Sequence, residues 1–268
     1  MTAGLAVHAW GRPDGPTLVL FHGNGDSGRC WPDAVERWAP GYRVLAVDAR
    51  GHGRSPRFTT AELDRLGEVF TDDTEAVLED VRRTAGAYPV LAVGHSLGAG
   101  TLAAVMARRP DLLNAAVLID PPWDSPLVGP EPRPEIGGAR VEFIVACLAD
   151  PEGARAEQAV HNPAWSSAEQ QAWLEAKQEV DLAMVAIGNG RVASPWPGLC
   201  ARIATPTLVV TGDPARGVLV GEQTRTTLAA IDNPAITVVE IPGADHYVRQ
   251  SAPDAFHAIV DPWVAAHL

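Results

Sequence analysis

The chain has 268 residues, of which 21 are Lys or Arg and 33 are Asp or Glu, so its formal net charge is −12. This acidic balance argues against nucleic acid and anionic membranes as partners, because phosphate groups would be repelled. A hydrophobic content of 46% fits a packed globule and excludes global disorder. Aromatic residues make up only 6% of the chain, and they comprise eight Trp, five Phe and three Tyr.

The three cysteines are an odd and widely spaced set, which predicts neither a disulfide framework nor a zinc site. The first residues contain neither a charged segment nor a long apolar segment, so we expect no signal peptide. No run of about 18 apolar residues occurs, so we expect no membrane-spanning helix. These features favour a cytoplasmic protein. We expect a monomer or homodimer whose partner is a small molecule.

Apolar runs predict the strands in chain order. Residues 5–10 are a candidate edge strand, and further runs follow at 17–21, 43–47, 90–93, 115–119, 207–210 and 236–241. Most are continuous runs of Val, Leu, Ile and Ala, which is typical of parallel strands covered by helices on both faces. Helical patterns lie between them, at 70–84, 97–109 and 254–267. This alternation predicts an α/β fold with a doubly wound, mostly parallel sheet.

One long interval interrupts the alternation. Roughly 85 residues separate the strand at 115–119 from the strand at 207–210, which is too long for a structureless loop in a compact domain. Helical patterns at 139–148, 154–160 and 167–187 predict an inserted helical cap over the carboxyl edge of the sheet. We therefore expect a core domain of residues 1–120 and 205–268 and a cap of residues 121–204.

A candidate nucleophile lies between the strand at 90–93 and the helix at 97–109. Residues 94–98 read Gly-His-Ser-Leu-Gly, which matches the G-x-S-x-G elbow in the strand-turn-helix context where that motif has chemical meaning. The tight turn presents the hydroxyl of Ser96, and the helix N-terminus adds positive partial charge where an oxyanion would form. The sequence therefore predicts Ser96 as a nucleophile.

From this motif the chain is identified as similar to the α/β-hydrolase superfamily, in its capped, serine-nucleophile branch, over nearly its whole length. Residues 21–25, Phe-His-Gly-Asn-Gly, resemble the family's H-G loop, and residues 48–55 resemble its D-x-R-G-x-G-x-S turn. The resemblance implies that the backbone N–H groups of Asn24 and Leu97 form an oxyanion hole. It also implies that His22 and the turn at 48–55 are structural.

A serine nucleophile needs a base and an orienting acid. The family's histidine follows the last strand, and His246 lies there in this chain. For the acid, Asp120 directly follows the strand at 115–119, a placement similar to haloalkane dehalogenase-like and lactonase-like members. Asp213 directly follows a glycine after the penultimate strand and is the alternative acid, with Asp124 as a further candidate. We predict Asp120 because the family's usual acid position holds no acidic residue here.

A serine at the elbow fits acyl transfer, whereas the resembling dehalogenases use Asp there. We therefore expect hydrolysis of carboxylic esters or lactones of small to medium hydrophobic substrates through an acyl-enzyme, with no cofactor and no metal. One alternative is a C–C bond hydrolase, a class in which cap arginines bind a substrate carboxylate; Arg140, Arg155 and Arg191 are its candidates. A cofactor-free perhydrolase similar to haloperoxidases is another. A third, of a different class, is a non-catalytic small-ligand receptor.

The substrate pocket is predicted from the cap interval, which contains half of the Trp residues: Trp123, Trp165, Trp173 and Trp196. Enclosed pockets for small apolar ligands are lined mainly by apolar and aromatic side chains. The candidate lining residues are Trp123, His95, Met184, Ile187 and Trp173. Core packing is the competing interpretation for Trp173 and Met184, which lie on predicted helices.

Overall fold

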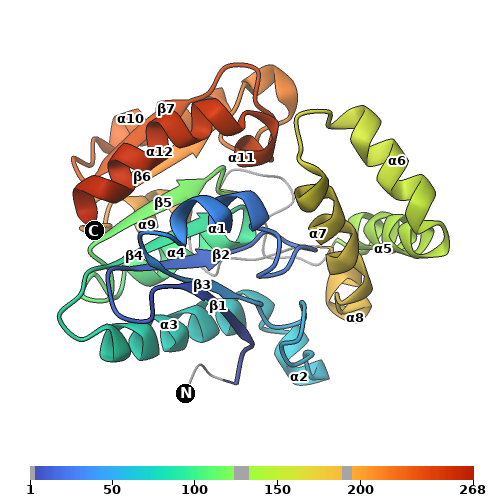
Figure 1. Cartoon of the computed structure of the whole chain (residues 1–268), viewed down its shortest axis with the longest axis horizontal. Coiled ribbons are helices and arrows are strands. Elements are labelled where there is room, and N and C mark those ends of the chain that lie inside the picture. Colours follow the sequence, from blue (N-terminus) through green and yellow to red (C-terminus); the bar gives the residue numbers. More distant parts are fainter. Residues whose placement is uncertain (1–3, 124–132, 189–194) are drawn as a thin grey trace.

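A computed structural model describes residues 4–123, 133–188 and 195–268. Seven strands form one sheet in the order β1-β3-β2-β4-β5-β6-β7 (Figure 1). Their bounds are Val7–Gly11 (β1), Thr17–Phe21 (β2), Arg43–Val47 (β3), Val90–His95 (β4), Ala115–Ile119 (β5), Thr207–Thr211 (β6) and Ile236–Glu240 (β7). Only the β1–β3 pair is antiparallel within this sheet. The predicted mostly parallel sheet is therefore confirmed.

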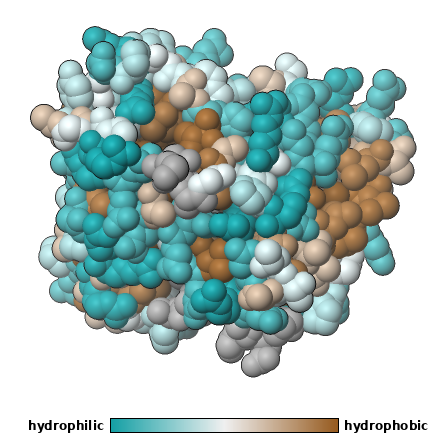
Figure 2. Space-filling model, turned by 90° about the horizontal axis from the view of Figure 1, so that it is seen from below, coloured by the Kyte–Doolittle hydropathy of each residue, from teal (hydrophilic) through white to brown (hydrophobic). Residues whose placement is uncertain are grey.

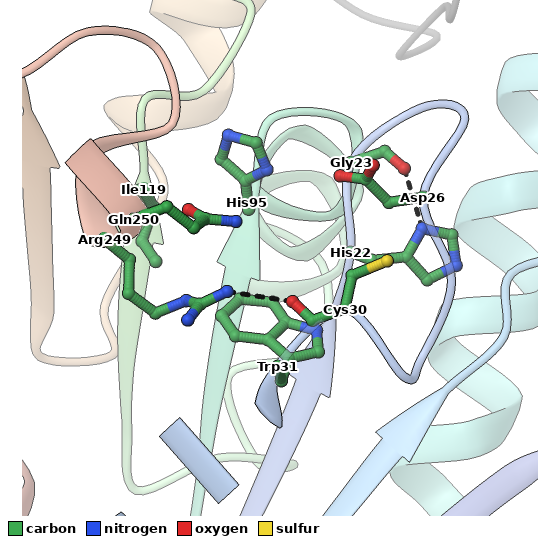
Figure 3. A pocket seen from close by; sticks show the side chains of 9 residues that line it. All are labelled: His22, Gly23, Asp26, Cys30, Trp31, His95, Ile119, Arg249 and Gln250. Carbon is green, nitrogen blue, oxygen red and sulfur yellow. Dashed lines mark hydrogen bonds between the residues drawn. The ribbon is translucent and has the colours of Figure 1, made fainter. Parts of the chain in front are cut away.

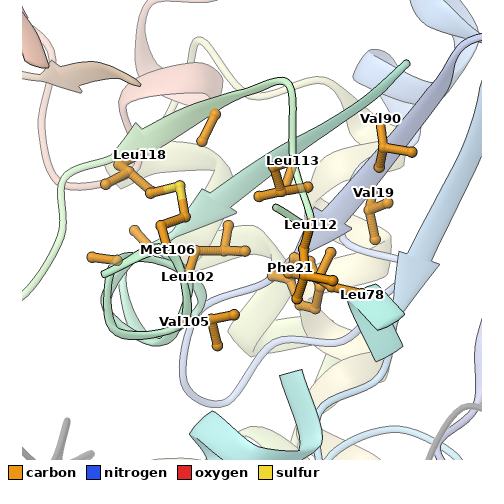
Figure 4. Packing of buried hydrophobic residues seen from close by; sticks show 14 of the residues in the cluster. Val19, Phe21, Leu78, Val90, Leu102, Val105, Met106, Leu112, Leu113 and Leu118 are labelled. Carbon is orange, nitrogen blue, oxygen red and sulfur yellow. The ribbon is translucent and has the colours of Figure 1, made fainter. Parts of the chain in front are cut away.

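Helices cover both faces of the sheet because successive strand residues point to opposite sides. In β4, Ala92 belongs to one core cluster, and its neighbours Leu91 and Val93 belong to the other. The first cluster (Figure 4) is completed by α3 (Leu66–Ala85), α4 (Leu97–Met106), α9 (Trp196–Cys200) and α10 (Glu222–Ile231). The second is completed by α1 (Pro32–Trp38) and α12 (Pro253–His267). Short elements complete the described core: α2 (Thr60–Leu63), α11 (Val248–Ser251) and a 3₁₀ turn at Pro214–Arg216.

Further helices come between β5 and β6 in the chain, and they project to one side of the sheet (Figure 1). They are α5 (Pro134–Ala149), α6 (Pro151–His161), α7 (Ser167–Gln178) and α8 (Leu182–Ala186). The helix predicted over 167–187 is interrupted between α7 and α8, because Asp181 begins a new helix there. Its side chain accepts a hydrogen bond from Ala183 N–H at 3.0 Å. α9 falls within the predicted cap interval but packs against α4 and α10 on the main sheet.

Several large apolar side chains of these added helices are exposed. Among the described residues, five large hydrophobic side chains on α5, α6 and α8 are exposed: Phe143, Val145, Leu148, Val160 and Leu182. Figure 2 shows an apolar area on the side of the molecule where these helices lie. In the described part of the chain, no helix combines the length and the apolar character needed to cross a membrane.

Candidate active site

Ser96 lies at the turn from β4 into α4, with φ 49° and ψ −113°. A positive φ is costly for a non-glycine residue and persists only where the surroundings enforce it. Here close packing enforces it: a Cβ at Gly98 would lie 2.4 Å from the carbonyl oxygen of Phe21, and one at Gly94 would lie 2.7 Å from the backbone of α4. The two glycines of the motif therefore allow strand and helix to approach, and the turn holds Ser96 at the carboxyl end of β4.

Asp120 lies at the carboxyl end of β5, fully buried and with φ 42°. Its carboxylate accepts hydrogen bonds from His246 Nδ1 at 2.6 Å, Thr211 Oγ1 at 2.8 Å, Leu219 N–H at 2.8 Å and Val220 N–H at 3.0 Å. Burial raises the pKa of this carboxyl, but the bonds from His246, Leu219 and Val220 lower the pKa by more, so it ends below its usual value. The group is therefore a carboxylate at neutral pH.

The Asp120 carboxylate fixes the tautomer of His246. An ionised carboxylate only accepts hydrogen bonds, so the proton of the neutral imidazole must lie on Nδ1. Nε2 is then left as an acceptor. Ser96 and His246 line the same cavity. The structure therefore brings together the three residues that the sequence predicted as nucleophile, base and acid.

Asp213, the alternative acid, is engaged elsewhere. Its Oδ1 accepts from Ala215 N–H at 2.9 Å, which caps the 3₁₀ turn, and its Oδ2 accepts from Gly243 N–H at 3.3 Å. Among the described residues, only Asp120 places a carboxylate on the His246 ring. The side chain of Asp124 lies outside the described residues.

Two buried histidines hold the loop that follows β2. His22 Nδ1 donates to the Gly23 carbonyl at 2.7 Å, and His52 Nε2 accepts from Gly25 N–H at 3.0 Å. Burial lowers the pKa of both histidines, so both are neutral at pH 7. A neutral imidazole has one donor and one acceptor nitrogen, as these bonds require. The predicted structural role of His22 agrees with this geometry.

Asn24, at the centre of this loop, lines the cavity together with Ser96. Its backbone N–H has no acceptor within the residues that the structure describes, and neither does that of Leu97 at the first position of α4. Gly98 N–H donates to the His22 carbonyl at 3.1 Å and so joins the loop to the helix. Leu97 N–H directly follows Ser96 and Asn24 lines the same cavity, so two backbone donors without a described acceptor are available for the predicted oxyanion hole.

Lys177 also contacts this loop, and the sequence predictions missed it. Its ammonium donates to the Gly25 carbonyl at 2.7 Å and lies 3.4 Å from Asp26 Oδ1 and 4.8 Å from the Trp173 ring centroid. The side chain is only 5% exposed. The available signal was compositional, because Lys177 is the only lysine in a chain whose other basic residues are all arginine. Tyr247, which directly follows His246 and also lines the cavity, was missed as well.

The cavity at Ser96 has a volume of about 230 Å³ and lies between the sheet and the added helices. Its described walls from those helices are Arg140, Phe143, Ile144, Trp173, Lys177 and Val185. Two of the predicted lining residues, His95 and Trp173, line this cavity. Within the described chain, no group of three or more His, Cys, Asp or Glu side chains is arranged to hold a metal ion.

Three predicted lining residues lie elsewhere. Trp123 is buried in the first core cluster and stacks on Trp196 with ring centroids 5.6 Å apart and planes at 7°. Met184 packs in an apolar cluster with Phe70 and Leu97, among others, and so joins α8 to the core. Ile187 follows α8, where its carbonyl accepts from the N–H of Arg133. None of the three is among the described residues that line the cavity, and Trp123 and Met184 pack in apolar clusters instead.

A buried ion pair anchors α7 to the core, and Figure 3 shows its arginine, Arg249, beside Cys30 and Trp31. Arg249 forms two hydrogen bonds with the carboxylate of Glu169 on α7, and both side chains are almost fully buried. The same guanidinium donates to the Cys30 carbonyl at 2.8 Å and lies over the Trp31 ring. A small cavity of about 10 Å³ beside these groups has room for about one water molecule. α7 is therefore a fixed wall of the site.

Comparison with known proteins supports the assignment that the fold and site suggest. A model of the alpha/beta hydrolase family matches residues 18–259, so the chain belongs to this family. Lipase LipV of Mycobacterium tuberculosis is 34% identical over 216 residues, which cover 78% of this chain and 70% of the lipase. The 2-(acetamidomethylene)succinate hydrolase of Mesorhizobium japonicum is 28% identical over 260 residues, or 90% of this chain and 84% of that protein.

Solved structures agree with the fold. The crystal structure of the enol-lactonase from Burkholderia xenovorans LB400 superposes with a TM-score of 0.71 and 20% sequence identity, and covers 97% of this chain and 96% of that one. The crystal structure of an E-2-(acetamidomethylene)succinate hydrolase gives a TM-score of 0.70 at 24% identity and covers 96% of this chain and 95% of that one. At these identities the likeness establishes the fold alone.

Proposed function

We propose that the protein is a serine hydrolase that cleaves carboxylic esters or lactones through an acyl-enzyme on Ser96. The observation that carries the proposal is the 2.6 Å bond between Asp120 and His246, beside a strained serine in the same cavity. A serine hydroxyl is a weak nucleophile until a positioned base removes its proton. Membership of a family whose relatives include a lipase and other hydrolases supports the same assignment.

In the proposed reaction, Ser96 Oγ attacks the acyl carbon while its proton passes to Nε2 of His246. The N–H groups of Asn24 and Leu97 stabilise the oxyanion, and Asp120 stabilises the imidazolium. His246 then protonates the leaving alkoxide, which departs and leaves the acyl group on Ser96. Water attacks this ester with His246 again as base, and the acid is released.

The cavity favours a small substrate. Its volume of about 230 Å³ lies below the roughly 300–1,000 Å³ typical of sites for drug-sized ligands. Phe143, Ile144 and Val185 give it an apolar side opposite the oxyanion loop. We therefore expect short acyl esters or small lactones to be turned over faster than long-chain lipids.

The test combines labelling with turnover. A fluorophosphonate probe is expected to label the wild-type chain but not Ser96→Ala, and short 4-nitrophenyl esters should be hydrolysed with a burst of one 4-nitrophenol per active site. The Ser96→Ala variant should show wild-type circular dichroism, so that loss of labelling reports the nucleophile. A folded wild-type protein that neither reacts with the probe nor hydrolyses esters or lactones would contradict the proposal and favour the receptor alternative.

A further inference from the structure

Arg140 is a cation in the wall of the Ser96 cavity that has no partner in the described part of the chain. It lies on α5, is partly buried, and forms no ion pair or hydrogen bond with any residue that the structure describes. Two other buried or partly buried arginines do have partners: Arg249 is paired with Glu169, and Arg50 is paired with Asp73. Burial lowers the pKa of Arg140, while nearby Tyr247 raises it.

The remaining charges in the described cavity wall compensate each other. Lys177 faces Asp26, and its ammonium is also occupied by the Gly25 carbonyl and the Trp173 ring. Asp26 therefore does not neutralise Arg140. Among the described residues, one positive charge of the cavity is therefore left uncompensated, although the whole chain has a net charge of −12.

A partly buried charge without a partner costs stability, and such groups are normally paired. An arginine that faces an active-site cavity without a protein carboxylate can receive one from the substrate. The planar guanidinium matches a carboxylate with two parallel hydrogen bonds, whereas a phosphate dianion would leave charge unmatched by a single arginine. We propose that Arg140 binds a carboxylate group of the substrate, so that the natural ester or lactone is an anion. This inference rests on the proposed hydrolase function.

The cavity geometry makes this a specificity contact. Arg140 lies on α5 together with Phe143 and Ile144, whereas the oxyanion loop and Ser96 belong to the core. A substrate that spans the cavity would thus place its carboxylate on α5 and its acyl carbon at Ser96. Binding energy from a group remote from the reacting bond orients that bond for attack.

A pair of matched esters tests the proposal. Mono-4-nitrophenyl glutarate carries a terminal carboxylate, and 4-nitrophenyl pentanoate is a neutral ester of similar length. We expect the ratio of kcat/KM for the anionic over the neutral ester to fall about tenfold or more in Arg140→Gln, and to recover in part in Arg140→Lys. Arg155→Gln, which changes an exposed arginine on α6, is the control and should leave the ratio within about twofold of wild type. An equally small change in Arg140→Gln would overturn the proposal.

A binding measurement separates this proposal from the hydrolase assignment. Calorimetry with glutarate and Ser96→Ala measures anion binding without turnover, and we expect the affinity to fall about tenfold or more in Ser96→Ala/Arg140→Gln. Arg140-dependent glutarate binding without any ester hydrolysis would leave the anion site standing and reject the proposed reaction. Hydrolysis of both esters with no dependence on Arg140 would support the proposed reaction and reject the anion site. Tighter binding of inorganic phosphate than of glutarate would overturn the choice of a carboxylate.

Discussion

The ammonium of Lys177 on α7 donates a 2.7 Å hydrogen bond to the carbonyl oxygen of Gly25. These residues are 152 positions apart, and the bond joins an added helix to the loop that contains Asn24. Gly25 N–H is held from the other side by His52 at 3.0 Å. The peptide groups beside Asn24 are therefore fixed from both the core and α7, which orients the donor proposed for the oxyanion hole.

Replacing Lys177 is expected to reduce turnover more than substrate binding. A hydrogen bond to a charged group is worth about 1.5–3 kcal/mol, so loss of this contact in Lys177→Met should lower kcat by about tenfold or more. KM for a neutral ester should change much less, because the contact acts on the oxyanion donor.

Lys177→Met also leaves the buried charge of Asp26 without its cation, which by itself lowers stability. A control is therefore needed that removes both charges. The double variant Lys177→Met/Asp26→Asn removes both charges and should recover thermal stability but not kcat. Arg29→Met, which breaks a more exposed ion pair with Glu179 at the C-terminal end of α7, should keep kcat close to wild type. Recovery of kcat together with stability in the double variant would show that Lys177 has only a structural role.

The same Asp→Asn substitution at Asp120 and at Asp213 tests which of the two is the acid that orients His246. Asp120→Asn removes the charge that holds the His246 tautomer, and turnover is expected to fall by around 10⁴-fold while circular dichroism stays unchanged. Asp213→Asn keeps a side chain that can cap the turn at Ala215 and should keep turnover within a few-fold of wild type. A larger loss of turnover in Asp213→Asn than in Asp120→Asn would instead identify Asp213 as the acid.

The sequence predicted the sheet closely because its strands are continuous apolar runs between polar segments. The strand predicted at 43–47 has those bounds in the structure, and the strand predicted at 207–210 extends by one residue. The missed helices had weak patterns. α10 buries only Thr224 and Leu228, so few of its positions reveal a helical period. α1 has seven residues and begins at a proline, which sequence patterns alone do not distinguish from a loop.

The candidate site also contains residues that the sequence predicted well and residues that it did not. Ser96, Asp120 and His246 each follow a strand, so topology alone brings them to one edge of the sheet. Arg140 and Lys177 belong to helices whose packing on the core depends on contacts far apart in sequence, such as the pair between Glu169 and Arg249. The sequence named Arg140 as one of three candidate cap arginines, but local patterns carry no information about such contacts, so they could neither select Arg140 nor reveal Lys177.

Trp123 and Trp173 separate structural from specificity roles. Trp123 is buried against Trp196, so Trp123→Ala should destabilise the fold by about 3–5 kcal/mol in urea unfolding. Trp173 lines the cavity, so Trp173→Ala should instead raise the kcat/KM of a hexanoate ester relative to an acetate ester. If Trp123→Ala shifted this acyl selectivity as much as Trp173→Ala, its placement in the core would be contradicted.

The buried histidines predict that stability declines as the solution becomes acidic. Burial lowers the pKa of His22 and His52, and it lowers the pKa of His95 to about 3. In the unfolded chain each imidazole binds a proton near pH 6.5, so below that pH the unfolded state holds more protons than the folded state. The contribution of these histidines to the free energy of unfolding is therefore fully present above about pH 6.5. It is lost as pH falls, by up to about 1.4 kcal/mol per pH unit for each histidine. Urea midpoints should thus fall steadily from about pH 6.5 to about pH 5, before carboxylates such as Asp120 titrate. In His95→Gln the slope should be smaller by about one proton, whereas an unchanged slope would mean that His95 is protonated in the folded protein as readily as in the unfolded chain.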